Sequence, residues 1–188
     1  LWMGEPDSAV NCTVDYAQEI GASSVGFTVY GGSNNEIEMV EEFRDAQEAA
    51  RDHGLGVVMW AYPRGQGLKR DTDPDVIAYA ARQALELGAD VAKVKYPGSE
   101  AAMARTVRVA GPTSVVMSGG SKTDDLAFLR TVERAVEAGA PPRAGWGGPL
   151  PRPGPPGGPP PRAVGPLSRG GARARGGGAP AAAPAGVA

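Results

Sequence analysis

Helix-like and strand-like segments alternate along the first 140 residues, and this alternation limits the possible folds more than any other feature of the chain. Hydrophobic spacing predicts helices and strands in turn at 8–20, 24–30, 35–52, 55–62, 74–87, 90–96, 99–109, 113–118 and 123–138. Strands that alternate with helices of this length form βαβ units around a parallel sheet. The sequence therefore predicts an α/β fold.

A short sequence motif occurs three times, each time where a predicted helix ends. The glycine of the motif is Gly21 in the first copy, Gly88 in the second and Gly139 in the third, and each directly follows the last helical residue. Glycine suits the left-handed position that ends a helix. The first two copies lead into a strand, and the third leads into a segment of very different composition.

Charge and composition divide the chain near residue 140. Residues 1–140 hold all 21 acidic residues against 13 Lys and Arg, a net charge of −8, while 141–188 hold six Arg and no acid. An acidic domain argues against nucleic-acid binding. Of the 48 residues in 141–188, 42 are Gly, Pro, Ala or Arg, so we expect a disordered tail. It is either a natural tail or the product of a reading-frame error where a further strand is due.

The sequence gives little support for a disulfide-bonded, membrane-spanning or metal-binding protein. Cys12 is the single cysteine, so a disulfide framework is excluded and a reducing cytoplasmic location is expected. No apolar run has transmembrane length, and no His, Cys and carboxylate residues have metal-ligand spacing. We expect no membrane, metal or other cofactor.

Side chains that could take part in catalysis or binding lie at the C-terminal ends of the predicted strands, where parallel α/β folds bind ligands. Trp60 and Tyr62 share one face of the strand 55–62, and Lys93 and Lys95 share one face of the strand 90–96. Burial disfavours the charged form of a lysine, and a neutral lysine can form a Schiff base with a carbonyl. The alternative is that both lysines reach solvent at the strand end and pair with acids.

The motif SGGSK, residues 118–122, predicts a second functional element. Two glycines between a strand and a helix let backbone N–H groups approach an anion, and the following helix N-terminus adds its positive end. Ser118, Gly119 and Gly120 are therefore candidates for binding a phosphate group, although Gly-Gly also serves ordinary turns.

The motifs WAYPRG, ADVAKVKYPG and VVMSGGSKT, taken together, resemble the archaeal-type class I fructose-1,6-bisphosphate aldolases, the DhnA/FbaB-like aldolase family. The resemblance covers about residues 1–140 and implies part of a TIM (β/α)8 barrel, about four βα units resembling strands 4–7, cut at both ends. It implies metal-free cleavage to dihydroxyacetone phosphate and glyceraldehyde 3-phosphate. It places the Schiff base at Lys93, proton transfer at Tyr62, a pocket wall at Trp60 and a substrate phosphate on Ser118, Gly119 and Gly120.

The same resemblance implies that intact members of the family form homo-oligomers. It also shows that two features of the family are missing from this chain. The family's catalytic aspartate on the first barrel strand has no counterpart here, and the segment 141–188 replaces the eighth strand. We therefore expect this chain to be an inactive fragment. Alternatives are the transaldolase-like 2-amino-3,7-dideoxy-D-threo-hept-6-ulosonate synthase of the same family, or a non-catalytic fragment that binds phosphate.

Overall fold

A computed structural model of the protein describes residues 4–118 and 124–140, which form five helices and four strands. In chain order the elements are α1 (Val14–Glu19), β1 (Ser24–Val29), α2 (Glu36–Asp52), β2 (Gly56–Ala61), α3 (Pro74–Glu86), β3 (Val91–Val94), α4 (Glu100–Ala110), β4 (Ser114–Met117) and α5 (Asp125–Glu137). The predicted tail at 141–188 lies outside the described residues.

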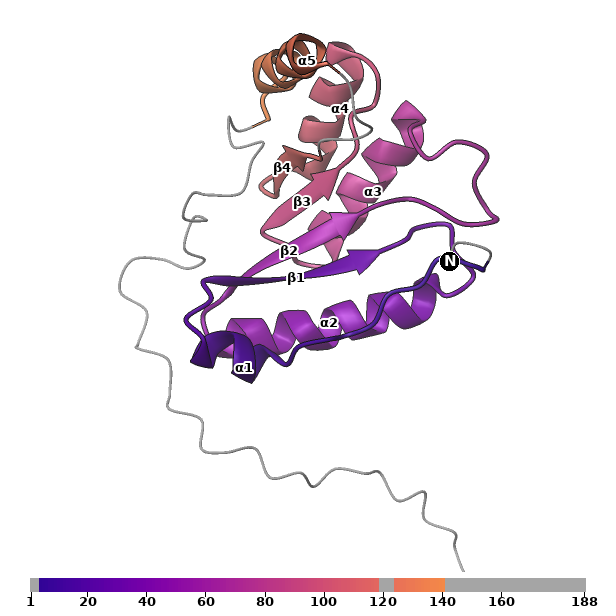
Figure 1. Ribbon diagram of the computed structural model, residues 1–188. Helices are drawn as coiled ribbons and strands as arrows, with labels where there is room; N and C mark the ends of the chain where they lie inside the picture. Colours follow the sequence, from indigo (N-terminus) through magenta and orange to yellow (C-terminus); the bar gives the residue numbers. More distant parts are fainter. Residues whose placement is uncertain (1–3, 119–123, 141–188) are drawn as a thin grey trace, which may run out of the picture.

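The four strands form one parallel sheet in the order β1-β2-β3-β4, so each strand pairs with its neighbour in the sequence. Figure 1 shows the helices along one side of this curved sheet, with the other side left uncovered by helices. A curved sheet of parallel strands with helices outside is part of a β/α barrel. The predicted α/β fold and partial barrel are confirmed.

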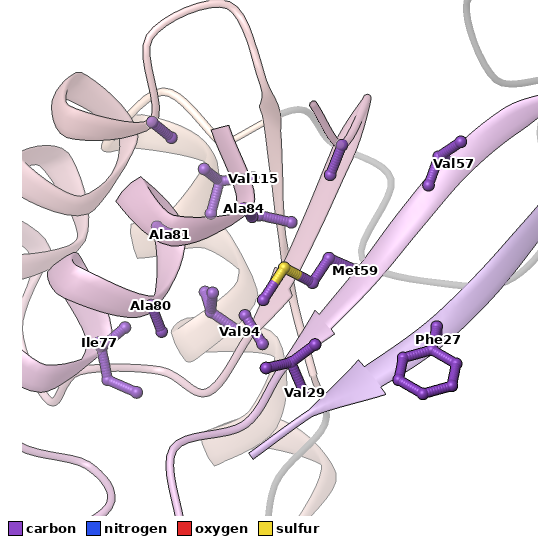
Figure 2. Close-up of a cluster of buried hydrophobic side chains, with 14 of the residues drawn as sticks. Phe27, Val29, Val57, Met59, Ile77, Ala80, Ala81, Ala84, Val94 and Val115 are labelled. Carbon is purple, nitrogen blue, oxygen red and sulfur yellow. The ribbon is translucent and has the colours of Figure 1, made fainter. Parts of the chain in front are cut away.

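Alternating side chains build the core between the sheet and the helices. On β2, Val57, Met59 and Ala61 are at most 2% exposed, whereas Trp60 is only half-buried. Side chains from all four strands and the small alanines of α3 belong to one buried cluster (Figure 2). Those alanines let α3 pack close to the sheet. The predicted division of β2 into a helix-facing side and a second side is therefore confirmed.

Helix ends follow the signals that the sequence carries. Gly21, Gly88 and Gly139 have φ of 80°, 76° and 97°, which confirms the left-handed position predicted for each. Asp73 caps α3 by accepting the N–H of Asp75 at 3.0 Å, with Pro74 in the first turn.

The N-terminal helix was predicted too long. It starts at Val14 behind a Thr13 cap, and the residues before it are not helical. Ser8 instead donates its hydroxyl to the carbonyl oxygen of Thr28 at 2.6 Å, which ties this segment to β1. Cys12, which falls inside the predicted range 8–20, consequently lies exposed before the helix. Ile37, in the second position of α2, is also exposed, at 75%.

Candidate active site

The strand register places four side chains in one row across the uncovered side of the sheet. Thr28 pairs with Trp60, Trp60 with Lys93, and Lys93 with Val116. We call these four residues the transverse row. Tyr62, Lys95 and Ser118 each lie two residues further along their own chain segments, toward the C-terminal ends of the strands. The parallel sheet thus brings together the residues predicted from three separate motifs.

Lys93 lies beside the indole of Trp60. Its Nζ is 5.9 Å from the centroid of the Trp60 ring, within the range of a cation–π contact. Both side chains are half-buried. The amine therefore has an aromatic neighbour on the β2 side.

A glycine in β1 makes room for this indole. A Cβ atom added at Gly26 would lie 3.1 Å from Cζ2 of Trp60 and 3.3 Å from Cη2. Glycine within a strand often marks a close approach by another group. Sequence reasoning did not use this signal, although it was present in the predicted strand 24–30.

Lys95 has a different environment from Lys93. It forms an ion pair with Asp71, and its side chain is 21% exposed. The hydrogen bond from Lys95 lowers the pKa of Asp71, and the charges of Lys95 and then Arg64 act in the same direction. Lys95 thus pairs with an acid, as the alternative interpretation of the two lysines expected for both of them.

Tyr62 and Ser118 are fixed by backbone hydrogen bonds that extend the sheet. The N–H of Tyr62 donates to the carbonyl oxygen of Val29 at 3.1 Å, and the N–H of Ser118 donates to that of Val94 at 2.8 Å. The Tyr62 side chain is half-buried beyond the end of β2. For Ser118, the engaged N–H leaves the hydroxyl as the group available to a ligand.

The predicted phosphate cradle is described only in part. Gly119 and Gly120 lie outside the described residues. The helix that follows begins behind Asp124, whose carboxylate accepts the N–H of Ala127 at 2.9 Å. This carboxylate already satisfies one of the free N–H groups at the start of α5.

The loop from Tyr62 to Asp73 packs beside the loop that follows β1. Arg64 donates its N–H to Gly31 at 3.0 Å, and its guanidinium lies 5.8 Å from the centroid of the Tyr30 ring. Glu5 accepts the N–H of Asn34 at 2.8 Å and that of Gln66 at 3.3 Å, so the N-terminal segment joins the loops after β1 and β2.

A hollow of about 340 Å³ lies on the other side of β1, between that strand and residues 8–17. Thr28 and Trp60 belong to its lining, but Lys93 and Tyr62 do not. Since the lining of this hollow includes neither Lys93 nor Tyr62, the candidate site is the transverse row and the strand ends beyond it.

The described residues offer neither a cluster of metal ligands nor a membrane-spanning helix. Among residues 4–118 and 124–140, no three His, Cys, Asp or Glu side chains gather closely enough to hold a metal ion. Within the same residues, no helix combines the length and the apolar composition that crossing a bilayer requires.

Comparison with known proteins places this arrangement in a family. The model of the DeoC/LacD family aldolases matches residues 3–157. A class 1 fructose-bisphosphate aldolase from Halobacterium salinarum is 75% identical over 140 residues, which make up 74% of this chain and 53% of that protein. A second such aldolase, from Thermoproteus tenax, is 48% identical over 141 residues, which make up 74% of this chain and 54% of that protein.

A solved structure agrees with these relatives. An archaeal fructose-1,6-bisphosphate aldolase, with its catalytic Lys covalently bound to the carbinolamine intermediate of the substrate, has a TM-score of 0.72 at 46% identity. The match covers 74% of this chain and 56% of that one. The chain thus spans about half the length of the curated relatives it matches. On the strength of the family match, which extends over most of the sequence, this chain belongs to the DeoC/LacD aldolase family.

Proposed function

We propose that this chain supplies the Schiff-base part of a class I fructose-1,6-bisphosphate aldolase. The observation that carries the proposal is the position of Lys93, whose amine lies beside Trp60 in a row across the strands, at the end of the sheet where barrel enzymes bind substrates. The family membership and the solved relative with a covalently modified lysine support the same chemistry.

Lys93 acts as the nucleophile in this proposal. The neutral amine attacks the C2 carbonyl of the open-chain sugar and forms a carbinolamine, which loses water to give an iminium ion. The iminium accepts the electron pair of the C3–C4 bond as that bond breaks. Glyceraldehyde 3-phosphate leaves, and an enamine remains on Lys93. Protonation of the enamine at C3 and hydrolysis of the imine release dihydroxyacetone phosphate and regenerate the amine.

Tyr62 moves the protons, and the strand ends hold the substrate. The phenol of Tyr62 is assigned to assist the proton transfers that accompany cleavage of the C3–C4 bond, because Tyr62 follows Trp60 on the same side of the sheet. Trp60 forms one wall of the pocket. Ser118 contributes its hydroxyl to a substrate phosphate, and Gly119 and Gly120 contribute backbone N–H groups.

Three further features belong to the proposal. Residues 1–140 form the barrel part, and the tail expected at 141–188 lies outside the described residues. The 188-residue chain by itself does not turn over substrate, because β1 and β4 each have one unpaired edge among the described residues. The intact protein is a cytoplasmic homo-oligomer, consistent with the exposure of Leu126 and Leu129 on α5, at 58% and 61%.

The test is turnover by a hybrid enzyme, in which the 140 aligned residues of this chain replace their counterparts in the Halobacterium salinarum aldolase. We expect the hybrid to release glyceraldehyde 3-phosphate from fructose 1,6-bisphosphate, and Lys93→Arg to abolish release. Lys95→Arg is the matched control and should retain activity, because arginine keeps the ion pair with Asp71.

A hybrid that folds but cleaves no fructose 1,6-bisphosphate would contradict the proposal. Activity only in the transaldolase-like synthase reaction would favour that enzyme instead. Equal activity with arginine at position 93 would remove Lys93 from the mechanism.

A further inference from the structure

The loop after β2, residues 62–73, is longer than the roughly 2–6 residues usual for such a connection. It carries no helix or strand, yet it contacts both the loop after β1 and, through Asp71, Lys95 beyond the end of β3. Loops of this length in compact domains are commonly functional. The contacts that fix this loop therefore bear on the geometry of the site.

The first half of the loop is held on the β1 side. Gly67 donates its N–H to Gly32 at 3.2 Å, and Gln66 donates to Glu5 at 3.3 Å. Leu68 packs so closely on Gly32 that a Cβ atom there would lie 2.6 Å from Cγ of Leu68. These contacts draw the loop toward β1 and away from β3, which carries Lys93.

The second half of the loop is joined to β3 by the ion pair between Asp71 and Lys95. Lys95 lies two residues beyond Lys93 and on the same side of the chain, about 7 Å further along the strand direction. Its side chain is 21% exposed and that of Asp71 is 40% exposed, so water screens this pair only in part. Arg64, from the first half of the loop, is a second positive group that acts on Asp71.

We propose that Asp71 and Lys95 are positioning residues, which fasten the loop 62–73 across the end of β3 and so hold Tyr62 and Trp60 toward the amine of Lys93. With one half of the loop fixed on β1 and the other on β3, the chain between Tyr62 and Asp71 spans the end of the site. Neither member of the pair needs to touch the substrate. This inference rests on the proposed aldolase function, and its test separates the two.

The first part of the test uses the 188-residue chain and does not depend on activity. The loop contains trypsin sites at Lys69 and Arg70, both exposed. We expect Asp71→Asn to raise the rate of cleavage at these sites by about fivefold, because the loop loses its attachment to β3. Glu86→Gln is the matched control, since it removes an exposed ion pair with Arg82 that does not involve the loop.

The second part measures kinetics in the hybrid enzyme. Asp71→Asn should lower kcat by about tenfold, because a small displacement of positioned groups is costly, and should change KM by less than about threefold. Asp71→Glu should recover most of kcat, since it keeps the carboxylate. Glu86→Gln should have no effect. If Asp71 contributed to stability alone, Asp71→Asn would lower the yield of folded enzyme. It would not lower kcat while leaving KM nearly unchanged.

The outcomes distinguish the two proposals. An active hybrid in which Asp71→Asn changes neither trypsin cleavage nor kcat overturns the positioning role and leaves the aldolase function intact. A folded but inactive hybrid overturns the aldolase function, whatever trypsin shows. Faster cleavage together with a lower kcat, both reversed by Asp71→Glu, supports the inference.

Discussion

The contact between Gly26 and Trp60 provides a sharp test of how the sheet shapes the site. In Gly26→Ala the new Cβ would lie 3.1 Å from the indole, whereas ordinary contacts of this kind are 3.4–4 Å. The indole must therefore move by a few tenths of an ångström. Because it packs over β1 and lies next to Lys93, it can yield only by moving away from Gly26.

Two effects on stability oppose each other in this variant. Overpacking costs about 1–3 kcal/mol, and replacing glycine in an extended strand recovers about 0.4–1 kcal/mol through the unfolded state. We expect a net loss of about 0.5–2 kcal/mol in the free energy of unfolding, measured by urea denaturation of the 188-residue chain. In the hybrid, kcat should fall by about two- to tenfold, since a displacement of 1 Å can cost about a hundredfold.

Gly4→Ala is the matched control, because a Cβ there meets nothing within 4 Å. The reasoning is refuted if Gly26→Ala is as stable as the parent or more so and leaves kcat unchanged. That result would mean that the indole is free to move and that β1 does not set its position.

Two further predictions concern charged groups around the sheet. Asp90 accepts the N–H of Val57 at 2.7 Å and pairs with Arg51 at 3.0 Å, so Asp90→Ala should lower the free energy of unfolding by about 1–3 kcal/mol in urea denaturation; a loss below about 0.5 kcal/mol would contradict this. The pKa of Asp71 is lowered chiefly by the hydrogen bond from Lys95, so its ionised form favours folding. This contribution is present above the unfolded-state pKa of about 3.9 and is lost as the pH falls through the lower folded-state pKa. The parent should exceed Asp71→Asn by about 0.5 kcal/mol at pH 7 and by nothing near pH 2, and a difference that grows on acidification would refute this sign.

Local signals in the sequence predicted most of the fold. Hydrophobic spacing located every described strand to within two residues, since each strand is buried on its helix side. The glycines at 21, 88 and 139 marked helix ends because only a residue without a side chain readily adopts φ near +80°. Alternation along a strand also placed Trp60 and Lys93 on the side away from the helices.

Contacts between distant residues account for what the sequence did not predict. The start of α1 was misplaced because Ser8 is held by Thr28, twenty residues away, rather than by a helix. The ion pair between Lys95 and Asp71 joins a loop to the end of a strand across 24 residues of sequence. Hydrophobic spacing does not identify such a partner. The close approach of Trp60 to Gly26 depends on the register between two strands, which becomes visible only in the folded sheet.

The central claim is that Lys93 forms the covalent bond to substrate, and locating the bond tests it most directly. The hybrid enzyme is incubated with fructose 1,6-bisphosphate, reduced with borohydride, digested and sequenced by mass spectrometry. The account predicts a reduced sugar adduct on Lys93, its disappearance in Lys93→Arg and its persistence in Lys95→Arg. An adduct on Lys95 alone, or none in a hybrid that turns over substrate, would contradict it.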